Sequence, residues 1–340
     1  MSVDARPTAM TRVDIGGTWM RIDTGRGRSR EASPSLINHP DRSPRHLFEM
    51  LVDRLVSVAP ERGSVALSLG AAMDDVTGVV HGSGPLWGDW VPDRDLRVTL
   101  GKARPDVTWH LFNDVTCAVA ALAHSVGREG HGRIGYLTIS SGIGLKIAQL
   151  DSGRIEVDHR GLQGEVGHLP AVLPPGRAHL GELRCECGRA GHVAALASGP
   201  GIARVASALG ISGYSPQWLR AGLDRGEEQP RRLLEYCAYP VAEVLRALWT
   251  TQPGLGVVGI GGGVAQGLGE HYRSALLGRL DGRNGYADDS STQWQQRIRV
   301  LDEPGVDLLH GAQILAEGGL RVTRVGMADV RISGEAKGRG

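Results

Sequence analysis

Two cysteines and two histidines near the middle of this chain constrain its fold more than any other feature. Cys185 and Cys187 flank a single residue, His192 follows shortly after them, and His168 ends a Gly-Glu-Val-Gly-His segment upstream. Thiolate sulfur and neutral imidazole are the ligands that tetrahedral zinc prefers, and nearby glycines let the backbone wrap. The group predicts a structural zinc site that fixes the loop from 165 to 192.

These residues also have ordinary explanations. A buried cysteine is often only a small apolar side chain, and a lone histidine is usually a polar surface or core residue. Proximity favours zinc over coincidence, although it supports His168 least. The spacing is not that of a nucleic-acid-binding zinc finger, so the metal is expected to shape a loop rather than to read DNA or RNA.

Length and composition are those of a globular protein with room for two domains. The 340 residues are 41% hydrophobic and 22% charged, with a net charge of +1, so no overall field attracts nucleic acid or an anionic membrane. Four cysteines give no disulfide framework and suit a reducing compartment. No signal peptide or apolar run of about 20 residues is present. We expect a soluble, cytoplasmic protein with no membrane or nucleic-acid partner.

Predicted strands and helices alternate, which indicates an α/β fold. Glycine-containing hairpins at Asp14 and again at Thr138 hint at two related lobes with a cleft between them. Helices are expected at 115–125, 231–250 and 310–317. Strands are expected at 12–15, 19–23, 65–69, 108–112, 135–139, 145–150, 256–260 and 297–301. Loops are expected at 82–90 and 151–195, and a frayed tail at 333–340.

Three glycine-rich turns follow predicted strands, where backbone N–H groups could approach phosphate oxygens. They are Asp14-Ile15-Gly16-Gly17-Thr18, Ser140-Ser141-Gly142-Ile143-Gly144 and Gly261-Gly262-Gly263. An aspartate at a strand end, such as Asp14, could also hold Mg²⁺ directly or through water. Each turn alone is equally explained as an ordinary close turn, and none is a Walker or Rossmann loop.

Asn113 and Asp114 lie at a predicted strand–helix junction. Asp114 could accept a proton from a substrate hydroxyl there. Taken alone, the pair is better explained as a helix cap followed by an acid that favours the helix dipole. A catalytic interpretation therefore depends on the motifs around the pair.

Taken in their order along the chain, these motifs resemble those of the ROK family (repressors, open reading frames and kinases). The resemblance covers about residues 12 to 320, and its most specific part is Glu-x-Gly-His at 165–168 with Cys-x-Cys-Gly at 185–188. It implies an actin-like, ribonuclease-H-like fold of two α/β lobes with ATP in the cleft. The family's enzymes phosphorylate sugars, typically at a primary hydroxyl, and are often dimers.

The resemblance also implies lobe boundaries. A small N-terminal lobe would span 12–113, with a C-terminal helix near 306–320 added to it. A larger lobe at 114–305 would carry the zinc loop at 165–192. ATP, Mg²⁺ and a structural Zn²⁺ are the implied cofactors, and a homodimer is the expected assembly.

The resemblance assigns roles residue by residue. Asp114 would be the general base toward the acceptor hydroxyl, while Asn113, Glu165 and His168 would bind the sugar. The residues that would line the ATP and phosphate site are Asp14, Gly16, Gly17, Thr18, Ser141, Gly142, Gly144, Gly261, Gly262 and Gly263. The zinc ligands would be His168, Cys185, Cys187 and His192.

Several acceptor-side positions depart from the family pattern. His192 stands where a third cysteine is usual, and imidazole is also a good zinc ligand. Ala194 replaces a sugar-binding glutamate near the anomeric end, and a lost hydrogen bond of this kind costs about 1–3 kcal/mol. The segments 70–74 and 85–90 differ as well, and Trp19 replaces a lysine. The ATP side is thus mostly retained, and the sugar side is altered.

The sequence predicts an ATP-dependent kinase for a hexose-like acceptor other than glucose, such as the 7-hydroxyl of a C7-cyclitol. A glucokinase or N-acetylhexosamine kinase acting at the 6-hydroxyl stays open. A non-catalytic sugar sensor is the alternative, although a sensor has no need of Asp114. A repressor is not expected, because only thirteen residues precede Asp14 and repressors of the family carry a helix-turn-helix domain there.

Overall fold

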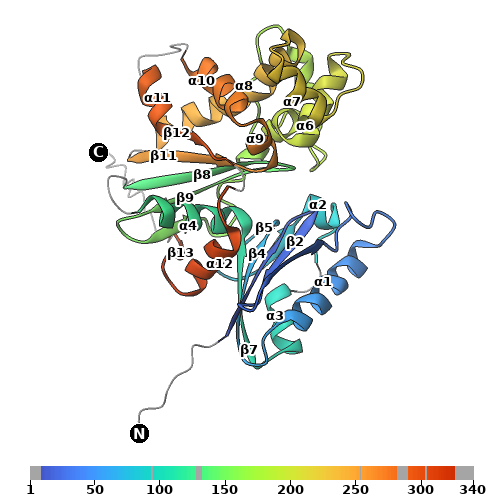
Figure 1. Ribbon diagram of the computed structural model, residues 1–340, viewed down its shortest axis with the longest axis vertical. Helices are drawn as coiled ribbons and strands as arrows, with labels where there is room; N and C mark the ends of the chain where they lie inside the picture. The colour runs from blue at the N-terminus through green and yellow to red at the C-terminus, as the bar shows by residue number, and fades with distance from the viewer. Residues whose placement is uncertain are drawn as a thin grey trace, which may run out of the picture.

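The computed structural model has two mixed β-sheets with helices packed on their faces (Figure 1). It describes residues 9–92, 95–127, 132–252, 254–281, 290–302 and 305–325. The predicted α/β fold is confirmed, while the tail expected at 333–340 lies outside the described residues. None of the described helices is long and apolar enough to cross a membrane.

The first sheet, here called the N-terminal sheet, has the strand order β3-β2-β1-β4-β7. Its strands are β1 (Met10–Ile15), β2 (Trp19–Asp23), β3 (Arg28–Ala32), β4 (Gly63–Leu69) and β7 (Val107–Asn113). Strands β1, β4 and β7 are parallel to one another, whereas β2 and β3 form antiparallel hairpins. Helices α1 (Pro44–Val58) and α3 (Leu96–Ala103) cover one face, over a core that includes Leu51 and Leu67.

The second sheet, the C-terminal sheet, has the order β12-β11-β8-β9-β10-β13. Its strands are β8 (Arg133–Ile139), β9 (Ile143–Gln149), β10 (Arg154–Val157), β11 (Leu255–Gly261), β12 (Ile298–Val300) and β13 (Arg321–Arg324). Most of the remaining helices lie on the face of this sheet that points away from the N-terminal sheet (Figure 1). They are α5 (Val193–Ala197), α6 (Gly199–Ala208), α7 (Pro216–Asp224), α8 (Glu228–Thr251), α9 (Gly263–Leu268), α10 (Glu270–Leu280) and α11 (Ser291–Arg297).

Helices α4 (Asp114–Val126) and α12 (Leu308–Ala316) lie between the two sheets (Figure 1). Helix α4 begins directly after β7 and packs on β8 and β9, while α12 packs on α4, β1 and β4. Gly311 allows this close approach, because an added Cβ would lie 1.9 Å from the carbonyl oxygen of Cys117. A third core, which contains Ala66, Tyr136 and Ala312, fills the space around these helices.

Two of the expected loops contain regular structure. The segment 82–90 includes the short helix α2 (Gly84–Trp87), which Ser83 caps and which buries Trp87 completely. A small hairpin of β5 (Ala72–Met73) and β6 (Val80–Gly82) precedes it. Within 151–195, strand β10 pairs with β9 and with the distant β13. The loop predictions were therefore wrong at α2 and β10. They were correct for most of 158–192, where the structure has turns and two short 3₁₀ helices. Strand β10 was missed because it depends on pairing with a strand far along the chain, whereas α2 had a local signal in its Ser83 cap.

We expect Gly311→Ala to destabilise the fold by about 1–3 kcal/mol, because its Cβ would displace backbone rather than a flexible side chain. Urea unfolding measures this. The matched control is Gly278→Ala, at an exposed position of α10 with no atom near the added Cβ. That change should be neutral or stabilise by up to about 1 kcal/mol. Equal stability of the two variants would contradict the tight α4–α12 packing.

Candidate active site

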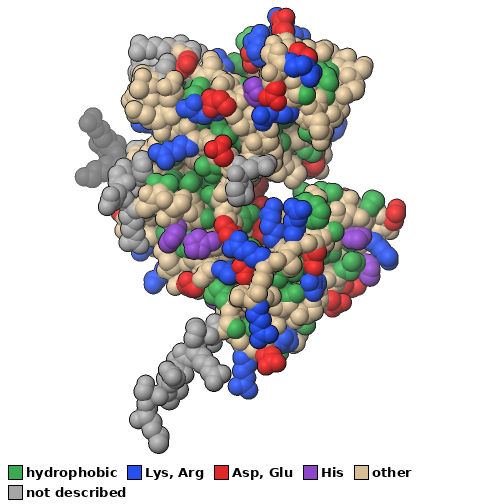
Figure 2. All heavy atoms as spheres, viewed as in Figure 1, with side chains coloured by type: hydrophobic (Ala, Val, Ile, Leu, Met, Phe, Trp, Pro, Cys, Tyr) green, Lys and Arg blue, Asp and Glu red, His purple; other side chains and the backbone are tan. Residues whose placement is uncertain are grey.

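A cavity of about 1250 Å³ separates the two sheets, and most of the residues singled out in the sequence line it. Figure 2 shows the hollow in the surface, with basic side chains gathered along one rim. The predicted site residues that line it are Asp14, Gly16, Gly17, Asn113, Asp114, Ser141, Gly142, Gly144, Glu165, His168, Cys185, Cys187, Gly262 and Gly263. Thr18, Gly261 and His192 are not among its lining residues.

Asp14 is the penultimate residue of β1 and is buried, with 2% of the residue exposed. Ser68, opposite on β4, donates its hydroxyl to Oδ1 at 2.8 Å. Arg21, opposite on β2, donates to Oδ2 at 2.7 Å. Burial raises the pKa of Asp14, although both contacts act to lower it. The cavity wall thus presents a fixed carboxylate and a guanidinium side by side.

A second arginine continues this row across the sheet. Arg30 of β3 lies opposite Arg21, and its guanidinium lies 4.4 Å above the ring of Trp19. Arg30 lines the cavity, and among the described residues it forms no ion pair. Trp19 therefore supports a cation from the neighbouring strand by a cation–π contact. That cation is free to meet an anionic ligand.

The opposite wall is largely backbone. At Gly262 the chain turns from β11 into α9 with φ of +91°, and an added Cβ would lie 2.6 Å from the carbonyl oxygen of Ile139. Gly261 lies behind this turn, where an added Cβ would meet the hydroxyl of Tyr136 at 2.1 Å. Gly262 and Gly263 thus face the cavity, whereas Gly261 makes room for packing.

Asn113 is the N-cap of α4. Its Oδ1 accepts the backbone N–H groups of Val115 at 2.9 Å and Thr116 at 3.3 Å, and its Nδ2 donates to the carbonyl of Ala71 at 2.8 Å. The capping interpretation is therefore correct for this side chain. Among the described residues, Nδ2 makes this one hydrogen bond, and Asn113 also lines the cavity.

Asp114 begins α4 and lines the cavity. Burial raises the pKa of Asp114 to about 7, and the negative charges of Asp14 and Glu165 add to the effect. The backbone N–H of Val115, which donates to Oδ1 at 2.9 Å, acts in the opposite direction. A carboxyl group with a pKa near neutrality is suited to take a proton from a hydroxyl and to release it later.

Glu165 lies just before the short 3₁₀ helix η1 (Val166–His168) and faces the same cavity. Burial raises the pKa of Glu165, while the positive charge of Lys146 lowers it. Lys146 was not singled out in the sequence. It is one of only three lysines, in a chain with 38 lysines and arginines together. The rarity of lysine in the whole chain was the one sequence signal that could have drawn attention to Lys146.

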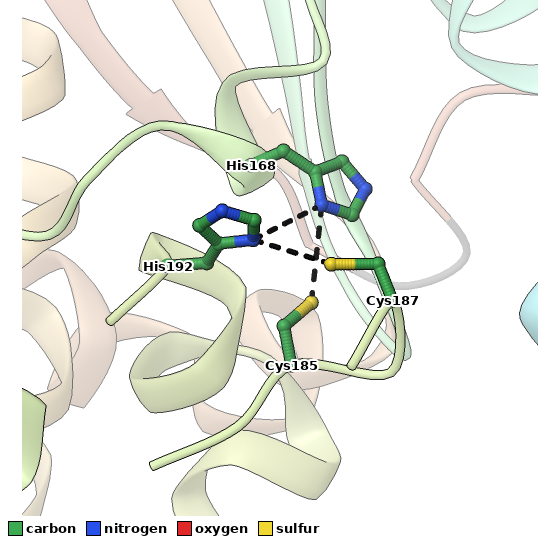
Figure 3. A group of neighbouring side chains, drawn as sticks. All are labelled: His168, Cys185, Cys187 and His192. Carbon is green, nitrogen blue, oxygen red and sulfur yellow. Dashed lines mark hydrogen bonds between the residues drawn. The ribbon is translucent and has the colours of Figure 1, made fainter. Parts of the chain in front are cut away.

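The four predicted metal ligands converge at the edge of the cavity (Figure 3). Their ligand atoms all lie within 4.8 Å of one another. Nδ1 of His192 lies 3.4 Å from Nδ1 of His168 and 3.3 Å from Sγ of Cys187, and Sγ of Cys185 lies 3.9 Å from Nδ1 of His168. Ligands of tetrahedral zinc are about 3.3–3.8 Å apart, given metal–ligand distances of about 2.0–2.3 Å. The distances of 3.3 and 3.4 Å lie in this range, and the longer ones, 3.9 Å and up to 4.8 Å, exceed it. The donor set, two thiols and two imidazoles, fits zinc.

Comparisons with known proteins identify the family of this chain. The family model described as the ROK family matches residues 10–275. A 2-epi-5-epi-valiolone 7-kinase of Actinoplanes sp. is 37% identical over 334 residues, covering 90% of this chain and 92% of its own. An N-acetylmannosamine kinase of Citrobacter koseri is 30% identical over 269 residues, covering 76% of this chain and 84% of its own.

Solved structures share the fold. The ROK hexokinase of Thermus thermophilus is 25% identical with a TM-score of 0.61, over 89% of this chain and 96% of that one. A ROK family glucokinase of Streptomyces griseus, solved with glucose and AMPPNP, is 19% identical with a TM-score of 0.65, over 91% of this chain and all of that one. The predicted actin-like kinase fold is confirmed.

If Asp114 takes the proton of the attacking hydroxyl, kcat/KM for the acceptor should fall about tenfold per pH unit below pH 7. The reason is that Asp114, whose pKa is raised to about 7, is then protonated and no longer a base. A pH profile between 5 and 9 measures this. Asp114→Asn should lose about 10²–10⁴-fold in rate and show no such limb. A flat wild-type profile would argue against the assignment.

Proposed function

This chain belongs to the ROK family and is an ATP-dependent carbohydrate kinase, and we propose that its acceptor is a C7-cyclitol rather than glucose. The observation that carries the proposal is Ala194, which lines the cavity and is 5% exposed. Its methyl group cannot accept a hydrogen bond from an anomeric hydroxyl. A carbocyclic acceptor has no hemiacetal centre that would require one.

The similarity to a kinase named for a cyclitol supports the same acceptor class. That relative shares more of its sequence with this chain than the N-acetylmannosamine kinase does, and over a larger part of both chains. The name places its phosphorylation at the 7-position. We therefore propose the exocyclic 7-hydroxyl as the attacking group here.

In the proposed reaction, Asp114 accepts the proton of that hydroxyl as it attacks the γ-phosphate of ATP. Asn113, Glu165 and His168 orient the acceptor ring. The glycine turns would hold the triphosphate through backbone N–H groups. Asp14 would hold Mg²⁺, directly or through water, and the ion would help to neutralise charge on the phosphates. Phosphoryl transfer depends mainly on such positioning and on charge stabilisation.

Zinc is a further part of the proposal. His168, Cys185, Cys187 and His192 would hold it, and it would fix the loop that presents Glu165. The acceptor-binding side of His168 would be its other ring nitrogen. The homodimer, the cytoplasmic location and the lobe boundaries at 12–113 and 114–305 stay predictions.

The decisive experiment is an ATP-to-ADP assay with Mg²⁺ across glucose, N-acetylmannosamine and 2-epi-5-epi-valiolone. We expect turnover of the cyclitol and a much lower kcat/KM for glucose. Ala194→Glu should raise the preference for glucose by about tenfold or more, since one hydrogen bond contributes about 1–3 kcal/mol. Preference of the wild type for glucose would defeat the proposed acceptor. Acceptor binding without any turnover would favour a sensor.

Metal analysis of purified protein tests the zinc site. We expect about one zinc per chain in the wild type and clearly less in Cys185→Ala, because a three-ligand site binds more weakly. Cys237→Ala is the matched control, since Cys237 is buried in α8 among apolar residues. It should retain the metal. Unchanged zinc in Cys185→Ala would refute the site.

A further inference from the structure

A buried aspartate beside the cavity holds the chain on both sides of the proposed base. Asp75 follows β5, and its side chain has no exposed surface. One carboxylate oxygen accepts the backbone N–H of Asn113, which precedes Asp114. The other accepts the hydroxyl of Thr116, two residues after Asp114, at 2.8 Å. Asp75 thus restrains the backbone that carries the base.

Lys146 lies on β9 of the C-terminal sheet and approaches Asp75 from there. Its ammonium nitrogen lies 4.0 Å from Oδ2 of Asp75, and its side chain is 7% exposed. It also donates to the carbonyl oxygens of Gly161 at 3.2 Å and Gln163 at 2.9 Å. These bonds restrain the loop that leads into Glu165.

Two glycines show how closely this loop is docked. At Gly161, with φ of +73°, an added Cβ would lie 2.4 Å from Cα of Asp74. At Gly164, with φ of +94°, an added Cβ would lie 1.7 Å from the carbonyl oxygen of Leu145, which precedes Lys146. The loop is therefore held between the turn that carries Asp75 and the strand that carries Lys146.

We propose that the Asp75–Lys146 ion pair is a positioning device that keeps Asp114 and Glu165 aligned on the same acceptor molecule. Neither partner lines the cavity, so both act through the residues they restrain. The inference rests on the proposed role of Asp114 as the base. The ion pair would hold the base and the acceptor-binding loop at a fixed separation.

The energetics of a buried pair give this device a recognisable signature. Removing one partner leaves an uncompensated buried charge, whereas removing both does not. Lys146 also lowers the pKa of Asp75 and of Glu165 by its positive charge, against the effect of burial. Single and double variants should therefore differ in a non-additive way.

The test compares Lys146→Met, Asp75→Asn and the double variant in steady-state kinetics with ATP and the acceptors of the panel above. We expect Lys146→Met to lose about 10–100-fold in kcat/KM for the acceptor, as misplaced reacting groups do, while KM for ATP stays unchanged. The double variant should recover severalfold over Lys146→Met. It should remain below the wild type for two reasons. The bonds to the loop carbonyls are still missing, and an amide at position 75 offers one acceptor oxygen where the carboxylate offered two.

The matched control is Arg324→Met. Arg324, on β13, forms an ion pair with Asp74 in the same turn, and Asp74 makes no bond to the residues that flank Asp114. The kcat/KM of Arg324→Met for the acceptor should remain close to that of the wild type. If Lys146→Met does not fold, Asp75→Asn, which preserves side-chain size, supplies the same comparison.

Three outcomes would decide against the inference. A lower unfolding midpoint with normal acceptor kinetics would make the pair purely structural, and additive losses in the double variant would remove the coupling. If KM rose equally for ATP and for the acceptor, the substitution would have distorted the cleft as a whole. Full turnover by Asp114→Asn would instead overturn the proposed base, whereas an inactive Asp114→Asn with a normal Lys146→Met would overturn the positioning role alone.

Discussion

The strand-to-helix junction at Asn113 is the constraint on which the rest of the structure depends. The Asn113 side chain ends β7, starts α4 and bonds to the Ala71 carbonyl in one arrangement. The chain leaves the N-terminal sheet here and passes between the two sheets. Asp114 reaches the cavity because of this cap, so the two explanations of the pair, a cap and a base, describe adjacent residues rather than competing roles.

Charge is distributed unevenly around the cavity. Asp14, Asp75, Asp114 and Glu165 all lie near it with raised pKa values, because burial removes solvent from each carboxylate. The positive charge of Arg21 lowers the pKa of Asp14, and that of Lys146 lowers the pKa values of Asp75 and Glu165, in each case against the effect of burial. Arg21 of β2 and Arg30 of β3 also line the cavity, so it contains both carboxylates and guanidinium groups.

Local signals in the sequence predicted the parts of the site that depend on local structure. The Gly16-Gly17 turn, the Asn113 cap and the Cys185-x-Cys187 loop can each be recognised within a few residues. The Asp75–Lys146 pair joins residues 71 positions apart, and β10 pairs with β13 across an even longer stretch. Such contacts leave no periodic pattern in the chain. Helix α1 was overlooked despite the Ser43 cap and Pro44 at its start, so that omission was avoidable.

The position of α12 has a consequence for synthesis of the protein. Helix α12 covers one face of β1 and β4. Both strands have been synthesised once residue 69 is reached, but α12 is synthesised only at residues 308–316. At roughly 5–20 residues per second, a ribosome needs about 10–50 s to make the intervening chain. During that time the N-terminal sheet lacks the helix that covers one of its faces, so this face cannot be fully buried until synthesis is almost complete.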